Sequence, residues 1–570
     1  MSKIVIIGGV AAGPKVAARA RRLMPDAEIT IIEKGRLISY AGCGMPFYVA
    51  GQIKDFNQLF STSYGVMRDE HYFMNEKGVK VLTRTEATAI DREKKEVTVT
   101  NLDTGETFTI PYDKLVLATG SEPFVPPIAG MDLKGVHRLN HPDDARGIMD
   151  QLEGVGEAVV IGAGLIGMEA ADALVKRRIF VSVVELKDQI LPGVLDPDLA
   201  AVLAYHLEEA GVEFHLGTKV LRLEGDDEGN VARVVTENGA VDAEMVIVAV
   251  GVRPNVKLAR EAGLAIGETG AIQVNEYLQT SDPDIYAVGD CVENRHLVSG
   301  RRVYIPLAST ANRQGRVAGD NVAGGRSRFK GVLGTAVLKV MGWNVGRTGL
   351  GEQQARELGY DVITAVNATH DRTHYYPGHD NLLMKLVVEK GSRRILGAQA
   401  IGGGEVVKRI DVVATALHFG ATVDDLADVD LGYAPPFSTP IDPAHHTANI
   451  ARNKLAGLAR TITAQELKEK MDRGDDFVLL DVRTPEQYNY RHIADDRVML
   501  VTLGDLRRRI EEIPRDKEIV TLCALGMRAY EAMRTLAGAG FKDVKFVEGG
   551  LQAWPYDLEY SGNRICNKRD

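Results

Sequence analysis

Cysteine is scarce in this sequence, and no two cysteines lie close together. The 570 residues contain four, at positions 43, 291, 523 and 566. This spacing excludes the framework of a disulfide-rich domain and favours a reducing compartment, so we expect a cytoplasmic protein. It also excludes the neighbouring cysteine pair through which dithiol enzymes store electrons. Any sulfur chemistry must therefore use single cysteines.

Long apolar runs and an excess of positive charge are also missing. No stretch approaches the roughly 20 apolar residues of a membrane helix, and the apolar run within MSKIVIIGG is too short for a signal peptide. The formal net charge of −10 disfavours nucleic acid or an anionic membrane surface as a partner. We expect no membrane span, no nucleic-acid partner and no metal site. The length allows three or four domains.

The N-terminus has the pattern of a dinucleotide-binding unit. The apolar run Lys3–Ile7 stops at Gly8, a helical stretch follows Gly13, and a strand over Glu28–Ile32 ends at Glu33. A helix N-terminus there would receive a pyrophosphate, and the carboxylate would bond a ribose hydroxyl. The turn lacks the middle glycine of the usual pattern, so its context carries the prediction.

A second unit of the same kind begins near residue 157. A strand over Ala158–Ile161 leads into a complete glycine pattern, and a strand over Phe180–Val184 ends at Glu185. The glycines are Gly162, Gly164 and Gly167. A carboxylate accepts bonds from a free 2′-hydroxyl but repels a 2′-phosphate, so we expect NADH over NADPH, with Lys187 able to soften the preference. Two such units predict two doubly wound domains.

Near residue 325 the pattern changes to that of an α+β domain. Strand-like runs occur at Thr335–Val340, Val362–Thr369 and Leu382–Glu389, and helical stretches at Glu352–Leu358 and Val406–His418. A polar, alanine-rich stretch over 445–460 then has the composition of a linker.

The last hundred residues or so form another α/β unit. Thr463 with Glu466 has the pattern of a helix start. Strands are expected at Phe477–Leu480, Ile519–Leu522 and Val544–Val547.

Cys43 is flanked by glycines in the stretch SYAGCGMPFY, about ten residues after the first unit's second strand. A lone thiolate cannot form an internal disulfide with a neighbour. It needs an external sulfur, as a mixed disulfide or persulfide, or an oxygen, as a sulfenic acid. We therefore expect the second sulfur to arrive with the substrate.

Three further strand-end turns carry a resemblance. They are Leu115–Gly120, Gly251–Asn255 and Ile285–Asp290. With the two glycine turns they resemble the pyridine nucleotide–disulfide reductase family over about residues 1–450. The resemblance implies the following domains: FAD binding at 1–150 and 276–325, NADH binding at 151–275, and dimerisation at 326–450, before a linker at 451–461 and a final domain at 462–570.

The same resemblance implies FAD and NADH as cofactors and identifies the residues that hold them. The expected cofactor-binding residues are Gly8, Gly13, Glu33, Lys34, Ala118, Thr119, Gly120, Gly162, Gly164, Gly167, Glu185, Gly251, Gly289, Asp290 and Ala308. Asp290 would meet the ribityl or pyrophosphate region of FAD, and Cys291 would pack behind it.

The loop around Cys43 resembles the single-cysteine branch of this family, which contains coenzyme A–disulfide reductases and NADH-dependent persulfide reductases. Ser39, Gly44 and Pro46 match the branch, whereas Gly42 replaces its asparagine. The branch is homodimeric, and partner-subunit tyrosines reach the reacting sulfur. Tyr375 and Tyr433 match them here, with Tyr376 as the alternative to Tyr375.

Basic residues after the first glycine turn suggest a binding site for coenzyme A. Lys15, Arg19 and Arg22 share one helix face, which fits either a phosphate clamp or a solvated helix edge. In the branch this helix contributes coenzyme A contacts. The expected substrate-binding residues are Lys15, Arg19, Arg22, Ser39, His71, Asn312 and Arg313, with coenzyme A a candidate bound molecule.

The second reactive sulfur is expected at Cys523, in the loop CALGMR between a strand and a helix. Backbone N–H groups and Arg528 would stabilise a thiolate or persulfide there. The surrounding motifs resemble the rhodanese family, which carries sulfane sulfur on such a cysteine, although Arg491 replaces the usual glycine before His492. No role is assigned to Cys566.

The predicted molecule is an α/β homodimer with two doubly wound domains, an α+β dimerisation domain and a C-terminal rhodanese-like domain. Its expected activity is FAD-dependent, NADH-driven reduction of a persulfide, a polysulfide or a coenzyme A-linked sulfur, with Cys43 and Cys523 as catalytic cysteines. Three alternatives stay open: a coenzyme A–disulfide reductase, an NADH oxidase or peroxidase using a sulfenic acid, and a slow redox-sensing sulfur carrier.

Overall fold

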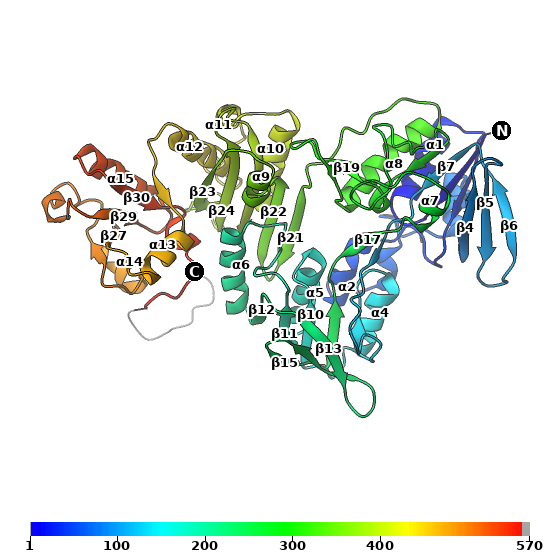
Figure 1. Ribbon diagram of the computed structural model, residues 1–570, viewed down its shortest axis with the longest axis horizontal. Coiled ribbons are helices and arrows are strands. Elements are labelled where there is room, and N and C mark those ends of the chain that lie inside the picture. Colours follow the sequence, from blue (N-terminus) through cyan, green and yellow to red (C-terminus); the bar gives the residue numbers. More distant parts are fainter. Residues whose placement is uncertain (1, 561–570) are drawn as a thin grey trace. The chain divides into compact units, whose positions relative to one another are not determined.

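The computed structural model describes residues 2–560, which form two compact bodies (Figure 1). The first contains residues 2–188 and 212–334, and the second contains residues 189–211 and 335–560. None of the helices in the described range has the length and apolar character that crossing a membrane requires.

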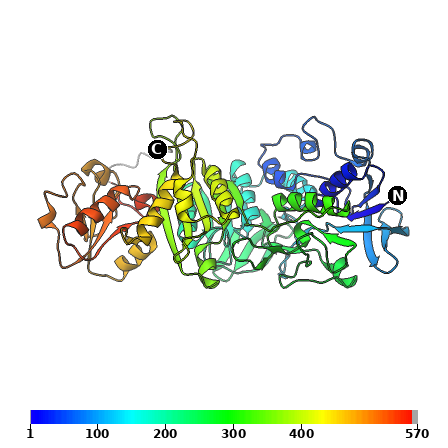
Figure 2. The same ribbon diagram turned by 90° about the horizontal axis from the view of Figure 1, so that it is seen from above.

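The first body begins with a five-stranded parallel sheet in the order β18-β7-β1-β2-β3. Its strands are β1 (Lys3–Ile7), β2 (Glu28–Ile32), β3 (Lys80–Leu82), β7 (Lys114–Leu117) and β18 (Ile285–Ala287). Helices α1 (Ala12–Leu23) and α8 (Ala308–Val322) lie side by side in both views (Figures 1 and 2). They approach closely because Gly319 has no side chain: a Cβ there would lie 2.6 Å from the Arg19 Cβ.

A second parallel sheet in this body has the order β12-β11-β10-β16-β9. Its strands are β9 (Val136–His137), β10 (Glu157–Ile161), β11 (Phe180–Val184), β12 (Val212–His215) and β16 (Met245–Val248). Helix α5 (Leu165–Lys176) follows β10 and packs on β11. The two doubly wound units predicted from the glycine turns are confirmed.

The first body also contains smaller strands and helices outside these two sheets, which the sequence patterns did not predict. They are β4 (Thr85–Asp91), β5 (Glu96–Asn101) and β6 (Thr107–Pro111); β13 (Val220–Gly225), β14 (Val231–Thr236) and β15 (Gly239–Asp242); the pairs β8 (Ser121–Pro123) with β17 (Val252–Pro254) and β19 (Asn294–Arg295) with β20 (Arg302–Val303); and helices α2 (Met45–Val49), α3 (Glu70–Lys77), α4 (Pro142–Gln151) and α7 (Lys257–Glu261). Several of these strands are largely exposed, so they lack the apolar runs by which buried strands are recognised.

The second body contains a five-stranded antiparallel sheet in the order β21-β22-β25-β24-β23. Its strands are β21 (Ala336–Val340), β22 (Trp343–Gly349), β23 (Val362–His370), β24 (Asn381–Glu389) and β25 (Ile395–Gly402). Helix α10 (Val406–His418) packs on β22 and β25, and α12 (Pro443–Leu455) packs on β23 and β24. Helices α6 (Pro197–Glu209), α9 (Glu352–Glu357) and α11 (Val423–Asp428) complete this part. The expected α+β character is confirmed.

The C-terminal unit has a parallel sheet in the order β26-β30-β29-β27-β28. The strands are β26 (Thr461–Ile462), β27 (Phe477–Asp481), β28 (Val498–Leu500), β29 (Glu518–Leu522) and β30 (Val544–Val547), with helices α13 (Ala464–Asp472), α14 (Pro485–Tyr490) and α15 (Met527–Gly538). Thr463 and Glu466 form the expected capping box. Helix α12 continues to Leu455, and Ala459 is buried in the C-terminal core, so little extended chain separates the two sheets.

Candidate active site

Glu33 fastens the first glycine turn. Its Oε2 accepts a hydrogen bond from the Gly9 N–H at 2.7 Å and its Oε1 accepts one from the Gly35 N–H at 2.7 Å. Gly13 lets α1 begin against the turn, since a Cβ there would lie 2.0 Å from the Gly8 oxygen. The carboxylate is held beside the helix N-terminus and keeps lone pairs for a ribose hydroxyl.

Glu185 repeats this arrangement at the second turn. It is 9% exposed, and its two oxygens accept the N–H bonds of Ala163 at 2.7 Å and Lys187 at 2.8 Å. A Cβ on Gly164 would meet no atom within 4 Å, so the turn is open where a pyrophosphate would lie. A Cβ on Gly167 would lie 1.9 Å from a turn carbonyl, which explains the glycine.

The predicted turns at residues 118–120 and 251–255 come together. Thr119 Oγ1 donates to the Asn255 carbonyl at 2.7 Å, and Asn255 Nδ2 donates to the Thr119 carbonyl at 2.9 Å. Gly120 and Gly251 have φ values of +66° and +104°, where a side chain would be strained. The two turns therefore brace each other beside the strand ends.

Polar groups around Asp290 fit the flavin that the sequence predicts. Burial raises the pKa of Asp290, against a hydrogen bond from Ser121 that lowers it. The Tyr304 hydroxyl is buried, and its pKa is raised by burial and by the charge of Asp290, against a hydrogen bond with Ser121 that lowers it. Gln314 Oε1 accepts the Gly289 N–H at 2.7 Å, which fixes the loop. A buried phenol hydroxyl and a desolvated carboxyl suit the hydroxyls of a ribityl chain.

Two expected cofactor residues occupy simpler positions. Ala308 is the first residue of α8, and the preceding Leu307 gives no side-chain cap, so the helix N-terminus keeps free N–H groups. Lys34 pairs with Glu86 at 2.8 Å on the surface.

Cys43 lies in a single 3₁₀ turn, Gly42–Gly44, directly before α2. The residue is exposed and its thiol is free. A Cβ on Gly44 would lie 2.6 Å from the Leu59 side chain, so this glycine lets the turn pack closely. Ser39 adopts a φ of +52°, and its N–H bonds to the Gly9 carbonyl at 2.8 Å. The cysteine loop is thereby tied to the first glycine turn.

Burial and two acidic side chains oppose the ionisation of Cys43. Although the residue as a whole is exposed, partial desolvation of its thiol is the first cause that raises its pKa, followed by the charges of Glu169 and Asp290. Glu169 lies on α5, where burial and the charge of Asp172 raise its pKa to about 7. Glu169 was not among the expected site residues, and its place two residues after the last glycine of the second turn was the available signal.

Some of the residues expected to bind coenzyme A are exposed, whereas others are engaged in contacts within the chain. Lys15, Arg22 and His71 are exposed, whereas Arg19 forms an ion pair with Asp320. On α8, Asn312 Nδ2 donates to the Ala308 carbonyl at 2.9 Å, and the Arg313 guanidinium lies 5.2 Å from the Phe329 ring centre.

Tyr375 and Tyr433 come from different loops of the second body and meet there. A side-chain hydrogen bond with Tyr375 raises the pKa of Tyr433. Their exposed fractions are 65% and 45%, so both rings project from the chain. Tyr376 instead closes a turn, with its N–H bonded to the Thr373 carbonyl at 2.9 Å.

Cys523 directly follows β29, and its sulfur lies in a cradle of backbone N–H groups. Its Sγ accepts hydrogen bonds from the Gly526 N–H at 3.1 Å and the Ala529 N–H at 3.4 Å. The Arg528 guanidinium is directed to Gln487 Oε1 at 2.9 Å. Two backbone amide donors are thus aimed at this sulfur. Cys566, by contrast, lies outside the described residues.

The whole arrangement has a match among characterised families. A model described as pyridine nucleotide-disulphide oxidoreductase matches residues 2–315, and the dimerisation domain of that family matches residues 335–445. The chain belongs to the pyridine nucleotide-disulphide oxidoreductase family. A rhodanese-like domain model matches residues 463–556.

Individual relatives extend this result. An "NAD(P)H sulfur oxidoreductase (CoA-dependent)" of Pyrococcus abyssi is 39% identical over 442 residues, which are 77% of this chain and 96% of that protein. An "NADH oxidase" of Methanocaldococcus jannaschii is 37% identical, over 80% of this chain and 99% of that protein. The solved structure of an NAD-dependent persulfide reductase from A. fulgidus is 46% identical with a TM-score of 0.93, and covers 97% of this chain and 100% of that one.

Membership of this oxidoreductase family implies FAD and NAD(P)H as cofactors. The clasped glycine turns, the buried Tyr304 hydroxyl and the desolvated Asp290 fit that requirement. In the described range, no group of three or more His, Cys, Asp or Glu residues is placed to hold a metal ion.

Proposed function

We propose that this chain is an FAD-dependent, NADH-driven reductase of sulfane sulfur whose substrate is coenzyme A persulfide. The observation that carries the proposal is the exposed, single Cys43 in a chain that also presents Cys523 in a cradle of amide donors. Among the described cysteines, Cys291 and Cys523 are buried, so Cys43 must take its sulfur partner from the substrate.

The reaction at Cys43 balances as a thiol–disulfide exchange followed by a reduction. The Cys43 thiolate attacks the sulfur bonded to coenzyme A, the S–S bond breaks, and hydrosulfide leaves. The product is a mixed disulfide between Cys43 and coenzyme A. Two electrons and a proton, derived from NADH, then restore the thiolate and release the coenzyme A thiol.

The cofactors would be held by the two glycine turns, whose backbone N–H groups bond to Glu33 and Glu185. Bound FAD would accept a hydride from NADH and supply both electrons to sulfur. Glu33 and Asp290 would hold the ribose and ribityl regions of FAD, and Glu185 would hold the adenosine ribose of NADH. The fixed orientation of Glu185 underlies the proposed preference for NADH.

Coenzyme A and a second subunit complete the proposed site. The exposed side chains of Lys15 and Arg22 are available to coenzyme A phosphates, and Arg19 orients against Asp320. The projecting rings of Tyr375 and Tyr433 would reach the sulfur bound at Cys43 of the other subunit in a homodimer. Mass analysis of small molecules released on denaturation should find coenzyme A with FAD, and FAD alone would remove coenzyme A as a tightly bound component.

Two alternatives are separated from this proposal by the choice of acceptor. An oxidase is favoured by the relative named NADH oxidase, and a coenzyme A–disulfide reductase would use the same exchange at Cys43. Steady-state kcat/KM for NADH oxidation should be compared with coenzyme A persulfide, coenzyme A disulfide, oxygen and peroxide. The persulfide should exceed each other acceptor by at least about ten-fold. A higher value with oxygen or disulfide would replace the proposal with the corresponding alternative.

A further inference from the structure

The two tyrosine-bearing loops are joined beneath the surface as well as at their tips. One loop connects β23 to β24 and contains Tyr375, and the other connects α11 to α12 and contains Tyr433. At the tips, Tyr375 bonds to Tyr433, and the Thr373 hydroxyl donates to the Pro435 carbonyl at 3.4 Å. Exposed tips with so few contacts need a support to keep a fixed position.

Arg409 of α10 supplies a buried connection between these loops. Its side chain is fully buried, with an exposed fraction of 0%. One terminal nitrogen donates to the Asp371 carbonyl at 2.7 Å, to Ser438 Oγ at 3.2 Å and to Asp442 Oδ2 at 3.1 Å. The other donates to the Glu405 carbonyl at 2.9 Å. A single guanidinium therefore holds the first residue of one loop and the end of the other.

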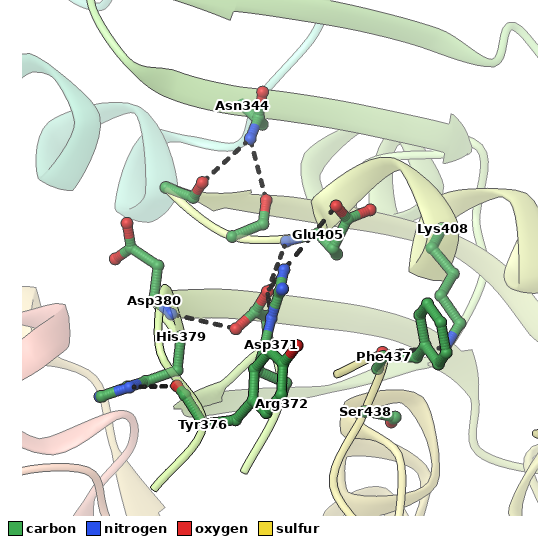
Figure 3. A network of polar contacts seen from close by, with 12 residues as sticks. Asn344, Asp371, Arg372, Tyr376, His379, Asp380, Glu405, Lys408, Phe437 and Ser438 are labelled. Carbon is green, nitrogen blue, oxygen red and sulfur yellow. Dashed lines mark hydrogen bonds and ion pairs between the residues drawn. The ribbon is translucent and has the colours of Figure 1, made fainter. Parts of the chain in front are cut away.

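The Asp371 side chain makes polar contacts of its own, which Figure 3 shows. Its carboxylate is 0% exposed and accepts bonds from the Arg372 guanidinium at 2.7 Å, the Asp380 N–H at 3.0 Å and the Glu405 N–H at 3.2 Å. Asp371 and Asp380 are the two ends of the Tyr375 loop. Both ends are thus fixed to one carboxylate, and that residue's carbonyl is fixed to Arg409.

The end of the other loop is fastened in a comparable way. Ser438 Oγ donates to Asp442 Oδ2 at 2.8 Å, and Asp442 Oδ1 accepts the Ala444 N–H at 3.0 Å as the cap of α12. The Lys408 ammonium donates to the Phe437 carbonyl at 3.3 Å. Arg409, the neighbouring residue, keeps the pKa of Asp442 low despite the burial that would raise it.

A buried ion pair is a costly means of stabilising a fold, because apolar side chains of similar volume often serve as well or better. Its advantage is orientation, since a planar guanidinium fixes several acceptors at once. We propose that Arg409 is a positioning residue that holds Tyr375 and Tyr433 in the geometry needed to reach the sulfur of the substrate. The inference rests on the roles proposed above for these two tyrosines.

The test is a double-mutant cycle between the buried arginine and the two tyrosines. Arg409→Lys keeps the charge but loses the fork of donors, so KM for coenzyme A persulfide should rise about ten-fold, with a smaller change in kcat. The rate at which NADH bleaches the flavin should stay unchanged. In the Tyr375→Phe/Tyr433→Phe background, Arg409→Lys should change KM by less than about two-fold, because the groups it positions are absent.

Lys385→Arg is the matched control. Lys385 is also a buried cation of this body, 2% exposed and paired with Asp196, Asp198 and Glu352. The substitution Lys385→Arg should leave KM for the persulfide unchanged. If Arg409→Lys does not fold, Ser438→Ala enters the same cycle, because it removes the two hydrogen bonds of Ser438 Oγ to Arg409 and Asp442 without changing a charge.

Three outcomes are distinct. A reduced effect of the arginine substitution in the tyrosine-free background supports the inference. An equal effect in both backgrounds, or no effect of Arg409→Lys on KM, overturns it and leaves the proposed function standing. A Tyr375→Phe/Tyr433→Phe variant with wild-type kinetics overturns both the inference and the proposed role of the tyrosines.

Discussion

Two acidic side chains add to the effect of burial in raising the pKa of the Cys43 thiol. Glu169 and Asp290 both disfavour the thiolate. Glu169, with a pKa of about 7, loses its proton as the pH rises through neutrality and then opposes ionisation of the thiol more strongly. The ionisation of the Glu169 carboxyl and that of the Cys43 thiol therefore disfavour each other. A substitution at Glu169 should change the pKa of the Cys43 thiol.

Glu169→Gln should shift the alkylation of Cys43 by iodoacetamide to lower pH. The neutral amide removes a negative charge that raises the thiol pKa, so the thiolate forms more readily. Mass spectrometry of the Cys43 peptide over a pH series measures the effect, with the exposed Glu153→Gln as control. A profile identical to that of the wild type would show that Glu169 does not act on this thiol.

Glu185→Ala should reduce the preference for NADH over NADPH. The wild type should favour NADH by about ten-fold or more in kcat/KM, because the 2′-phosphate carries about −1.5 to −2 charge and would lie against this carboxylate. Truncation removes that repulsion and also frees the Ala163 N–H. Lys187→Met is the opposite control and should increase the preference. Equal use of both nucleotides by the wild type would contradict the assignment.

Among the elements, the Cys523 loop behaves as a site of its own. Besides the amide donors to Sγ, the Cys523 carbonyl accepts the Leu551 N–H at 3.0 Å, and a Cβ on Gly550 would lie 2.3 Å from that carbonyl. The loop is thus packed against the turn after β30. The sulfur chemistry proposed for Cys523 should therefore depend on this C-terminal unit.

Cys523→Ser should abolish sulfur transfer from thiosulfate to cyanide and impair the use of polymeric sulfur donors. Reduction of small soluble persulfides and of coenzyme A disulfide should persist, because that exchange is proposed to take place at Cys43. Cys566→Ser serves as the matched cysteine control. Equal losses with every substrate would place Cys523 in the main catalytic cycle.

Local sequence patterns predicted most strands and helices around the candidate site. The parts they did not predict depend on partners that are distant in the sequence. The strand Phe180–Val184 and the helix Val406–His418 were predicted with the bounds observed, because each alternates or clusters apolar residues at its own period. The stretch expected as a linker instead continues α12 to Leu455. Lys454 forms an ion pair there with the buried Glu548, a residue 94 positions away. No local pattern records such a partner.

The same limit applies to the site. The glycine turns and the single cysteines were predicted from their spacing in the sequence. Glu169 and Arg409 were not, because their contacts near Cys43 and beneath the tyrosine loops form only in the folded chain. A charged residue on a helix looks solvated in sequence unless its partner is known.

For the whole molecule, the proposed homodimer should be active only through sites shared between subunits. Cys43→Ser and Tyr375→Phe/Tyr433→Phe chains, mixed at random after dissociation, should regain about a quarter of wild-type activity, since half of the dimers are mixed and each has one intact site. Persulfide reduction by the mixture, compared with each parent alone, measures this. No recovery despite confirmed subunit exchange would place the tyrosines in the same subunit as the cysteine they serve.

The most direct measurement of the central claim is the amount of sulfide released per NADH oxidised, with coenzyme A persulfide and without oxygen. The balanced exchange at Cys43 predicts one sulfide for each NADH, and it predicts no NADH-dependent sulfide from Cys43→Ser. Oxidation of NADH without sulfide, or NADH-dependent sulfide release that survives Cys43→Ser, would contradict the account.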